Sequence, residues 1–340
     1  MKTIKTLALT CAIAVGLVSC SDNDNNDSVI QNEAKVLFTS NNADGNVNIY
    51  NVTNINSVMK STLETSATAA DGIYYDGSED LIVQASRSTL GLEGYAGVSI
   101  ASSAINATVT ANIMSGLNMT SPREVAVNGD FYVVADNADA DGIDITKDGR
   151  LFIYTKSGSN FTLRNIITTD IKLWGITFIG NDLYAVADTT NELAVYSNFL
   201  NNTSTTTLTA SKQIAVEGIV RTHGLTYDSM TDTMVLTDIG DAGSGTDGGF
   251  HVIENFNSKF NGTANGATLA VNQQTRVAGS NTVLGNPVDV AYDGSTKTVF
   301  IAEAKNGKIL AFNNINTGGN ITPVYSADLA AASAVYFYKE

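Results

Sequence analysis

The chain has 340 residues, of which 43% are hydrophobic, and it carries a formal net charge of −15 at pH 7. So acidic a protein lacks the basic surface that phosphate backbones require, which argues against nucleic acid as a partner. Its two cysteines and two histidines show none of the usual spacings of a zinc site.

Residues 1–19 are predicted to be a lipoprotein signal peptide. Lys2 and Lys5 precede an apolar run over residues 7–18 that is too short to span a membrane. The segment ends in Leu-Val-Ser-Cys, which resembles a lipobox and implies cleavage before Cys20 and lipidation of that cysteine. The alternative is an ordinary secretory signal with a chance cysteine. Cleavage would also remove Cys11, which leaves no second cysteine for an intramolecular disulfide.

Residues 20–34 are predicted to be the lipidated cysteine and a disordered acidic tether. The run SDNDNNDSVIQNE is polar and shows no periodicity. An acidic run directly after the cysteine resembles the surface-export signal of certain Gram-negative lipoproteins. That resemblance implies an outer-membrane protein exposed at the cell surface, with the membrane as partner through the lipid anchor. The alternative is a plain solvated linker.

Residues 35–340 are predicted to form one domain built from a repeated hairpin. The phrase LWGITFIGNDLYAVAD, residues 173–188, has two alternating apolar runs separated by a Gly-Asn-Asp turn. Similar phrases begin at residues 71, 123, 223 and 288. The opening positions of the five copies are separated by 52, 51, 49 and 65 residues, and they are Gly72, Glu124, Gly175, Gly224 and Asp289. A third, apolar strand and a fourth, more polar strand follow each phrase.

Four strands over roughly 45–50 residues is the size of a propeller blade. The last residues, 333–340, match the first strand of the phrase, while residues 35–42 and 46–52 match its second and third strands. We therefore expect an all-β fold, a six-bladed β-propeller of four-stranded antiparallel blades, closed by pairing the N- and C-terminal strands in one blade. The 65-residue interval leaves a seven-bladed ring as the rival.

The ends of the second strands resemble those of the NHL-repeat and senescence-marker–gluconolactonase group of six-bladed propellers. The segments that carry this resemblance are VVAD, AVAD, VLTD and FIAE. In that group the ends of the second strands lie near the central channel, and gluconolactonase-like members hold a metal there that polarises a lactone or ester.

The resemblance makes the acids that end these strands candidate metal ligands. They are Asp136, Asp188, Asp238 and Glu303, while the first two blades carry Ser40 and Ser86 at this position. Acids that share one space require a cation or N–H groups to offset their charges. The alternative is that each carboxylate accepts hydrogen bonds from the backbone of its own or the neighbouring blade.

A second candidate cation site follows Asp136. Oxygen-bearing side chains recur there with the D-x-D-x-D-G spacing of a calcium loop, in which alternate oxygens wrap the ion and the glycine allows a tight bend. The candidate ligands are Asn137, Asp139, Asp141, Asp144 and Asp148. The alternative is a solvated acidic hairpin loop.

Three residues that immediately precede the opening positions are candidates for ligand binding. Arg123, Trp174 and His223 belong to successive repeats and are expected to ring one mouth of the channel. A sugar or an acidic small molecule could stack on Trp174, pair with Arg123 and exchange a proton with His223. The alternatives are packing between blades for Trp174 and a structural role for His223.

We expect a surface-anchored lipoprotein that acts as a ligand- or partner-binding module for a small molecule, glycan or protein. The alternative function is a calcium-dependent, lactonase- or esterase-like hydrolase with its site at the mouth of the channel. A third is a structural protein stabilised by calcium. No Ser-His-Asp arrangement is evident, so the sequence leaves open whether the protein is an enzyme.

Overall fold

The repeated phrase folds as a β-hairpin. In the computed structural model, β13 (Leu173–Ile179) pairs antiparallel with β14 (Asp182–Ala187), with Phe178 opposite Leu183. The turn between them requires a left-handed backbone, and Gly180 supplies it with a φ of 60°. The structure describes residues 33–101, 106–139 and 147–340, so the predicted signal peptide, Cys20 and most of the tether lie outside the described residues.

The other copies of the phrase also form antiparallel hairpins. They are β4 (Ala70–Asp76) with β5 (Leu81–Ser86), β9 (Pro122–Asn128) with β10 (Phe131–Asp136), β18 (Leu225–Asp228) with β19 (Thr233–Asp238), and β23 (Pro287–Asp293) with β24 (Thr298–Glu303).

A third strand pairs with each hairpin, and a fourth strand pairs with the third. The third strands are β6 (Gly91–Ala96), β11 (Gly149–Ser157), β15 (Glu192–Tyr196), β20 (Gly249–Glu254) and β25 (Lys308–Phe312). The fourth strands are β8 (Ile113–Met114), β12 (Asn160–Thr169), β17 (Lys212–Val216), β22 (Thr275–Ala278) and β26 (Tyr325–Asp328).

The two ends of the described chain share one sheet. The last strand, β27 (Ala332–Lys339), pairs antiparallel with the first, β1 (Lys35–Asn41), and Phe38 lies opposite Tyr336. The sheet continues through β2 (Val47–Asn51) and β3 (Met59–Glu64). The predicted pairing between the N-terminal and C-terminal strands is therefore present.

Short elements join or decorate these sheets. β7 (Asn106–Thr108), β16 (Thr206–Leu208) and β21 (Thr268–Leu269) add in parallel to β3, β12 and β17. One β8–β12 pair links two four-stranded groups. The helices are α1 (Val98–Ala101) and α2 (Phe256–Gly262), with 3₁₀ turns η1 (Phe199–Asn201), η2 (Val271–Gln273), η3 (Ser280–Thr282) and η4 (Ile315–Thr317). Helix α2 lies within the 65-residue interval and packs Phe256 and Phe260 against Tyr184.

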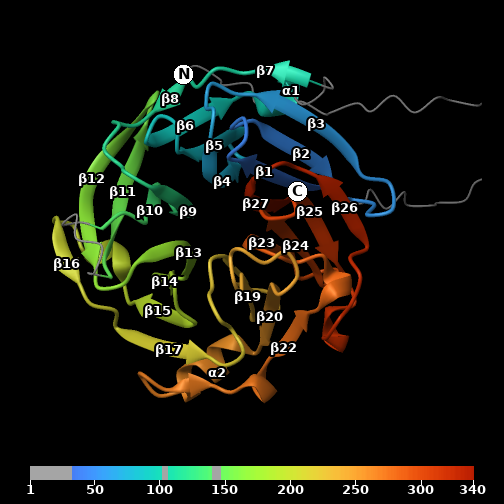
Figure 1. Cartoon of the computed structure of the whole chain (residues 1–340). Coiled ribbons are helices and arrows are strands. Elements are labelled where there is room, and N and C mark those ends of the chain that lie inside the picture. Colours follow the sequence, from blue (N-terminus) through green and yellow to red (C-terminus); the bar gives the residue numbers. More distant parts are fainter. Residues whose placement is uncertain (1–32, 102–105, 140–146) are drawn as a thin grey trace, which may run out of the picture. The chain divides into compact units, whose positions relative to one another are not determined.

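The core lies between neighbouring sheets. Val133 and Leu151 of one sheet pack against Leu183 and Ala185 of the next, and all four are fully buried. Along the chain, the innermost strands contact one another in the order β4, β9, β13, β18, β23 and β27, and β27 in turn contacts β4 (Figure 1). The prediction of a nearly all-β protein with several sheets is confirmed, and the arrangement is consistent with a propeller-like fold.

Candidate functional site

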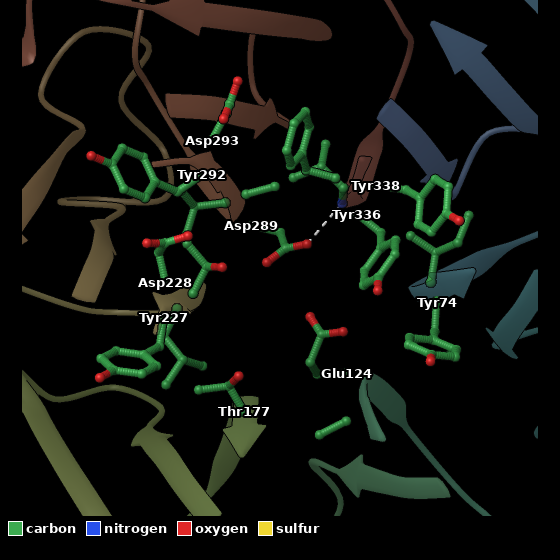
Figure 2. Close-up of a pocket in the computed structure, with 18 of the residues that line it drawn as sticks. Tyr74, Glu124, Thr177, Tyr227, Asp228, Asp289, Tyr292, Asp293, Tyr336 and Tyr338 are labelled. Carbon is green, nitrogen blue, oxygen red and sulfur yellow. Dashed lines mark hydrogen bonds between the residues drawn. The ribbon is translucent and has the colours of Figure 1, made fainter. Parts of the chain in front are cut away.

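A pocket of about 590 Å³ opens between the innermost strands. Its walls come from the middle and C-terminal parts of β4, β9, β13, β23 and β27 and from β18 with the turn that follows it (Figure 2). Alternate residues of a strand point to the same side, so each strand presents every second side chain to this space. The pocket therefore combines residues that are far apart in the sequence.

The opening position of each repeat lies where neighbouring inner strands approach closely. A Cβ atom on Gly72 would lie 2.6 Å from the Val125 nitrogen, and one on Gly175 would lie 2.4 Å from the His223 carbonyl oxygen. These contacts involve backbone atoms, which cannot give way as a flexible side chain could. The residues at this position are Gly72, Glu124, Gly175, Gly224, Asp289 and Ala334. Two of the six positions thus carry carboxylates where the others carry small residues.

Glu124 and Asp289 point toward one another inside the pocket (Figure 2). Asp289 is only 5% exposed, and its Oδ2 accepts a hydrogen bond of 2.8 Å from the Val335 backbone N–H. Oε1 of the half-buried Glu124 accepts one of 2.8 Å from the Val125 N–H. Neither carboxylate forms an ion pair with any residue in the described ranges.

Burial raises the pKa of both carboxyl groups. For Glu124, burial is the main cause and the nearby charge of Asp289 adds to it. For Asp289, burial raises the pKa to about 7, the charge of Asp71 adds to the effect, and backbone N–H groups oppose it. The pair therefore takes up a proton far more readily than exposed carboxylates do.

Tyrosines form one wall beside the carboxylates. The rings of Tyr74 and Tyr336 meet edge to face with centroids 5.1 Å apart, and Tyr338 lies next to them (Figure 2). Across the pocket, the side chain of Met230 is at the rim, where the residue is 91% exposed. The site thus presents aromatic and apolar surface around two acids.

Two further acids line the pocket but are bonded to the turns that follow their strands. Asp228 accepts hydrogen bonds from the backbone N–H and hydroxyl of Thr231, at 2.8 and 2.7 Å. Asp293 pairs with Lys35 at 2.6 Å and accepts bonds from Ser295 and Thr296. These partners distinguish them from Glu124 and Asp289.

The three predicted ligand-binding residues lie together, but outside the pocket lining. The guanidinium carbon of Arg123 is 3.9 Å from the centre of the Trp174 ring, and the Trp174 and His223 rings stack with centroids 3.5 Å apart. We call this group the Arg123–Trp174–His223 stack. Its ends are anchored: Arg123 pairs with Asp71 at 3.0 Å, and His223 Nε2 lies 3.0 Å from Asp188 Oδ1. The polar groups of Arg123 and His223 that were predicted to bind a ligand therefore already have partners within the protein.

Burial and the bond to Asp188 set the charge of His223. Burial lowers the pKa of His223 to about 4, although Asp188 opposes the shift. The imidazole is thus neutral at pH 7. Burial disfavours ionisation of Asp188, but the hydrogen bond to His223 and the Arg221 guanidinium hold the Asp188 pKa well below its usual range. Arg221 Nη2 lies 2.8 Å from Asp188 Oδ1.

The other three predicted acids at strand ends accept backbone hydrogen bonds. Asp136 binds the N–H groups of Thr120 and Ser121 at 2.9 and 2.7 Å and pairs with Arg150 at 2.8 Å. The backbone donors for Asp238 and Glu303 are those of Val220, Arg221 and Gly240, and of Gly285, Asn286, Lys305 and Asn306. Each carboxylate ties the end of its strand to the loop that enters the same hairpin.

The proposed calcium loop is only partly described. Asp141 and Asp144 lie outside the described residues, while Asp139 and Asp148 lie at the edges of the gap. Asn137 donates from its amide to the Leu173 carbonyl oxygen at 2.5 Å and to Asp188 Oδ2 at 3.1 Å. Within the described ranges, no three His, Cys, Asp or Glu residues gather closely enough to hold a metal ion. In the same ranges, no helix is both long and apolar enough to cross a membrane.

Glu124, Asp289 and the tyrosine wall were not predicted to be functional residues. A signal was present, because acids occupied two repeat positions at which three other copies have glycine. These acids mark a site only because neighbouring inner strands approach closely at the opening positions, and the sequence does not show that approach.

Comparisons with known proteins support the architecture alone. No family model matches the chain, and no curated protein matches it. A chain of a nidogen–laminin complex is similar in structure with a TM-score of 0.59 at 13% identity, covering 89% of this chain and 98% of that one. A "putative 6-phosphogluconolactonase" from Bacteroides fragilis gives 0.58 at 9% identity, covering 92% and 100%. One from Bacteroides uniformis gives 0.56 at 10%, covering 91% and 100%. These similarities indicate a β-propeller-like fold.

Proposed function

We propose that this protein is a surface-anchored lipoprotein β-propeller that binds a small-molecule ligand in the channel pocket. The observation that carries the proposal is the pocket itself, whose size suits a small organic molecule and whose two inward carboxylates have no ionic partner in the described chain. Cys20 is the proposed lipid site, the acidic tether the spacer, and the outer face of the outer membrane the location.

The proposed fold has six blades. It is supported by the inner-strand contacts, which return from β27 to β4, and by the pairing of β1 with β27. Helix α2 and its flanking loops account for the long interval that suggested a seventh blade. Ring closure removes exposed sheet edges, which stabilises the fold and leaves the channel as the natural place for a ligand.

Blocking the pocket tests the proposed function. Thr177 lines it, and Thr177→Trp would place a bulky indole in the space (Figure 2). We expect compounds that raise the melting temperature of the wild-type protein to lose that effect in the variant, since a ligand that binds the native state stabilises it. The probes are choline, butylamine, glucose and glucono-1,5-lactone. Equal stabilisation of both proteins, or no stabilisation by any probe, would refute the proposal.

A second candidate is hydrolysis of a lactone or ester. The raised pKa of Glu124 and Asp289 favours it, because one carboxylate can take a proton from water while the other, protonated, donates one to the leaving oxygen. Two structural neighbours carry a lactonase name. A phosphorylated substrate would be repelled by the acids, so an uncharged lactone fits better. Turnover of glucono-1,5-lactone that Glu124→Gln and Asp289→Asn each abolish would support this activity.

Calcium is proposed only for the Asn137–Asp148 loop. The strand-end acids Asp136, Asp238 and Glu303 fit a metal poorly because backbone N–H groups already donate to them. Glu124 and Asp289 are two carboxylates, fewer than the oxygen ligands that calcium requires. The proposed lactone hydrolysis therefore relies on the carboxyl groups of Glu124 and Asp289 alone.

A further inference from the structure

We infer that the channel pocket selects an organic cation, whose ammonium group lies between Glu124 and Asp289 while its apolar part contacts the tyrosine wall. This inference rests on the proposed function, because it names the class of ligand for that same pocket.

The Glu124 and Asp289 carboxylates have no basic side chain as a partner in the described ranges. Lys339 is the basic residue among those that line the pocket, and it pairs with Glu33 at 2.6 Å. Arg123, the neighbour of Glu124 in the chain, pairs with Asp71 and stacks on Trp174. No cation in the described ranges is thus left to pair with the two carboxylates, and their charge is neutralised either by protons, which their raised pKa favours, or by a cationic ligand.

Glu124 and Asp289 lie at positions where carboxylates are buried and close to each other. Asp289 is nine-tenths buried, and backbone N–H groups are its hydrogen-bond partners. Burying a carboxylate without a cation is costly, and crowding two of them adds repulsion. The fold itself needs no acid there, since Gly72, Gly175, Gly224 and Ala334 occupy the equivalent positions. At a pH at which both carboxyl groups are ionised, a bound cation would offset this cost.

The volume and the aromatic lining of the pocket fit an organic cation better than a metal ion. A volume of about 590 Å³ is far larger than a metal ion, and no metal-holding group of three ligands occurs in the described ranges. The rings of Tyr74 and Tyr336 stand beside the carboxylates (Figure 2). Ring faces attract ammonium groups, and aromatic walls are a common solution for binding them. An ammonium ion that carries an alkyl body fits both features.

The test compares charged ligands with neutral molecules of the same shape. Choline is titrated against 3,3-dimethylbutan-1-ol, and butylamine against butan-1-ol, into the full-length protein in detergent at pH 8 by calorimetry. We expect each cation to bind at least ten times more tightly than its neutral counterpart. Glu124→Gln and Asp289→Asn should each weaken the binding of the cations at least tenfold, while Glu64→Gln, on the outer strand β3, should leave it unchanged.

The outcomes separate this inference from the proposed function. Equal binding of charged and neutral partners, or binding of cations that neither pocket variant weakens, would overturn the inference. Pocket-dependent binding of glucose or the neutral alcohols alone would overturn it while leaving the proposed function intact. If none of these compounds bound, both would be refuted. The two variants change different strands, so a folding defect in one leaves the other as the test.

Discussion

Replacing Asp289 with asparagine is predicted to stabilise the protein increasingly as the pH rises. The folded carboxyl group takes up its proton near pH 7, whereas the ordinary value is 3.8. Between these values the folded state binds more protons than the unfolded state, so this group's contribution to stability falls as the pH rises. Asparagine has a similar shape, can still accept the hydrogen bond from Val335 and cannot ionise.

The size of the effect follows from the pH interval. From pH 5 to pH 7 the wild-type protein loses about 1.4 kcal/mol per pH unit through this group, so the advantage of Asp289→Asn should grow by about 3 kcal/mol between pH 5 and pH 8. The two histidines act in the opposite direction, because burial lowers the pKa of His223 and His251 to about 4. The contribution of these two histidines to folding stability therefore declines as the pH falls below 6.5, and it does so equally in the wild type and in Asp289→Asn.

Urea unfolding at pH 5, 6, 7 and 8 measures this difference, with the fluorescence of Trp174, the only tryptophan, as the signal. The difference between variant and wild type isolates Asp289 from the histidines. A gain that stays constant with pH, or a variant that becomes relatively less stable at pH 8, would show that folding does not raise the pKa of the Asp289 carboxyl group.

Four other perturbations test separate parts of the structure. Asp188→Asn should cost about 3 kcal/mol of unfolding free energy, since His223, Arg221 and Asn137 all bond to this buried carboxylate; a loss in urea unfolding no larger than that of Glu64→Gln would contradict this. Gly224→Ala should cost roughly 1–3 kcal/mol, because its Cβ would lie 2.6 Å from the Asp289 Cα. Gly262→Ala, with no atom within 4 Å, is the control, and equal melting of the two proteins would refute the packing argument. Calcium at a hundredfold excess over its Kd should add about 2.7 kcal/mol of stability if the Asn137–Asp148 loop binds it; identical melting curves in calcium and in chelator would reject the site. Cys20→Ser should move the protein from the membrane fraction to the soluble fraction, and unchanged fractionation would argue against lipidation.

Strand pairing was largely predictable because its signals are local. The Gly180 turn and the alternating residues around it specify a hairpin without help from the rest of the chain. The parallel additions of β7, β16 and β21 were not predicted, because two or three residues carry no periodicity and their pairing depends on neighbouring sheets. Helix α2 was missed for a related reason: its buried residues Phe256 and Phe260 pack on Tyr184 of another sheet.

The site was only partly accessible from the sequence. The repeat register brought Arg123, Trp174 and His223 to one level, and the structure places them in one stack. The register did not reveal that their polar groups bond to Asp71 and Asp188. Repeat comparison likewise gave the positions of Glu124 and Asp289, but their burial and mutual approach are products of packing between strands of different sheets.

A crystal structure of the protein with choline at pH 8 would show whether the pocket binds an organic cation between its two acids. We expect density for the trimethylammonium group between the Glu124 and Asp289 carboxylates, with the rest of the ligand along Tyr74 and Tyr336. Choline bound elsewhere on the molecule, with the channel pocket holding only solvent, would contradict it.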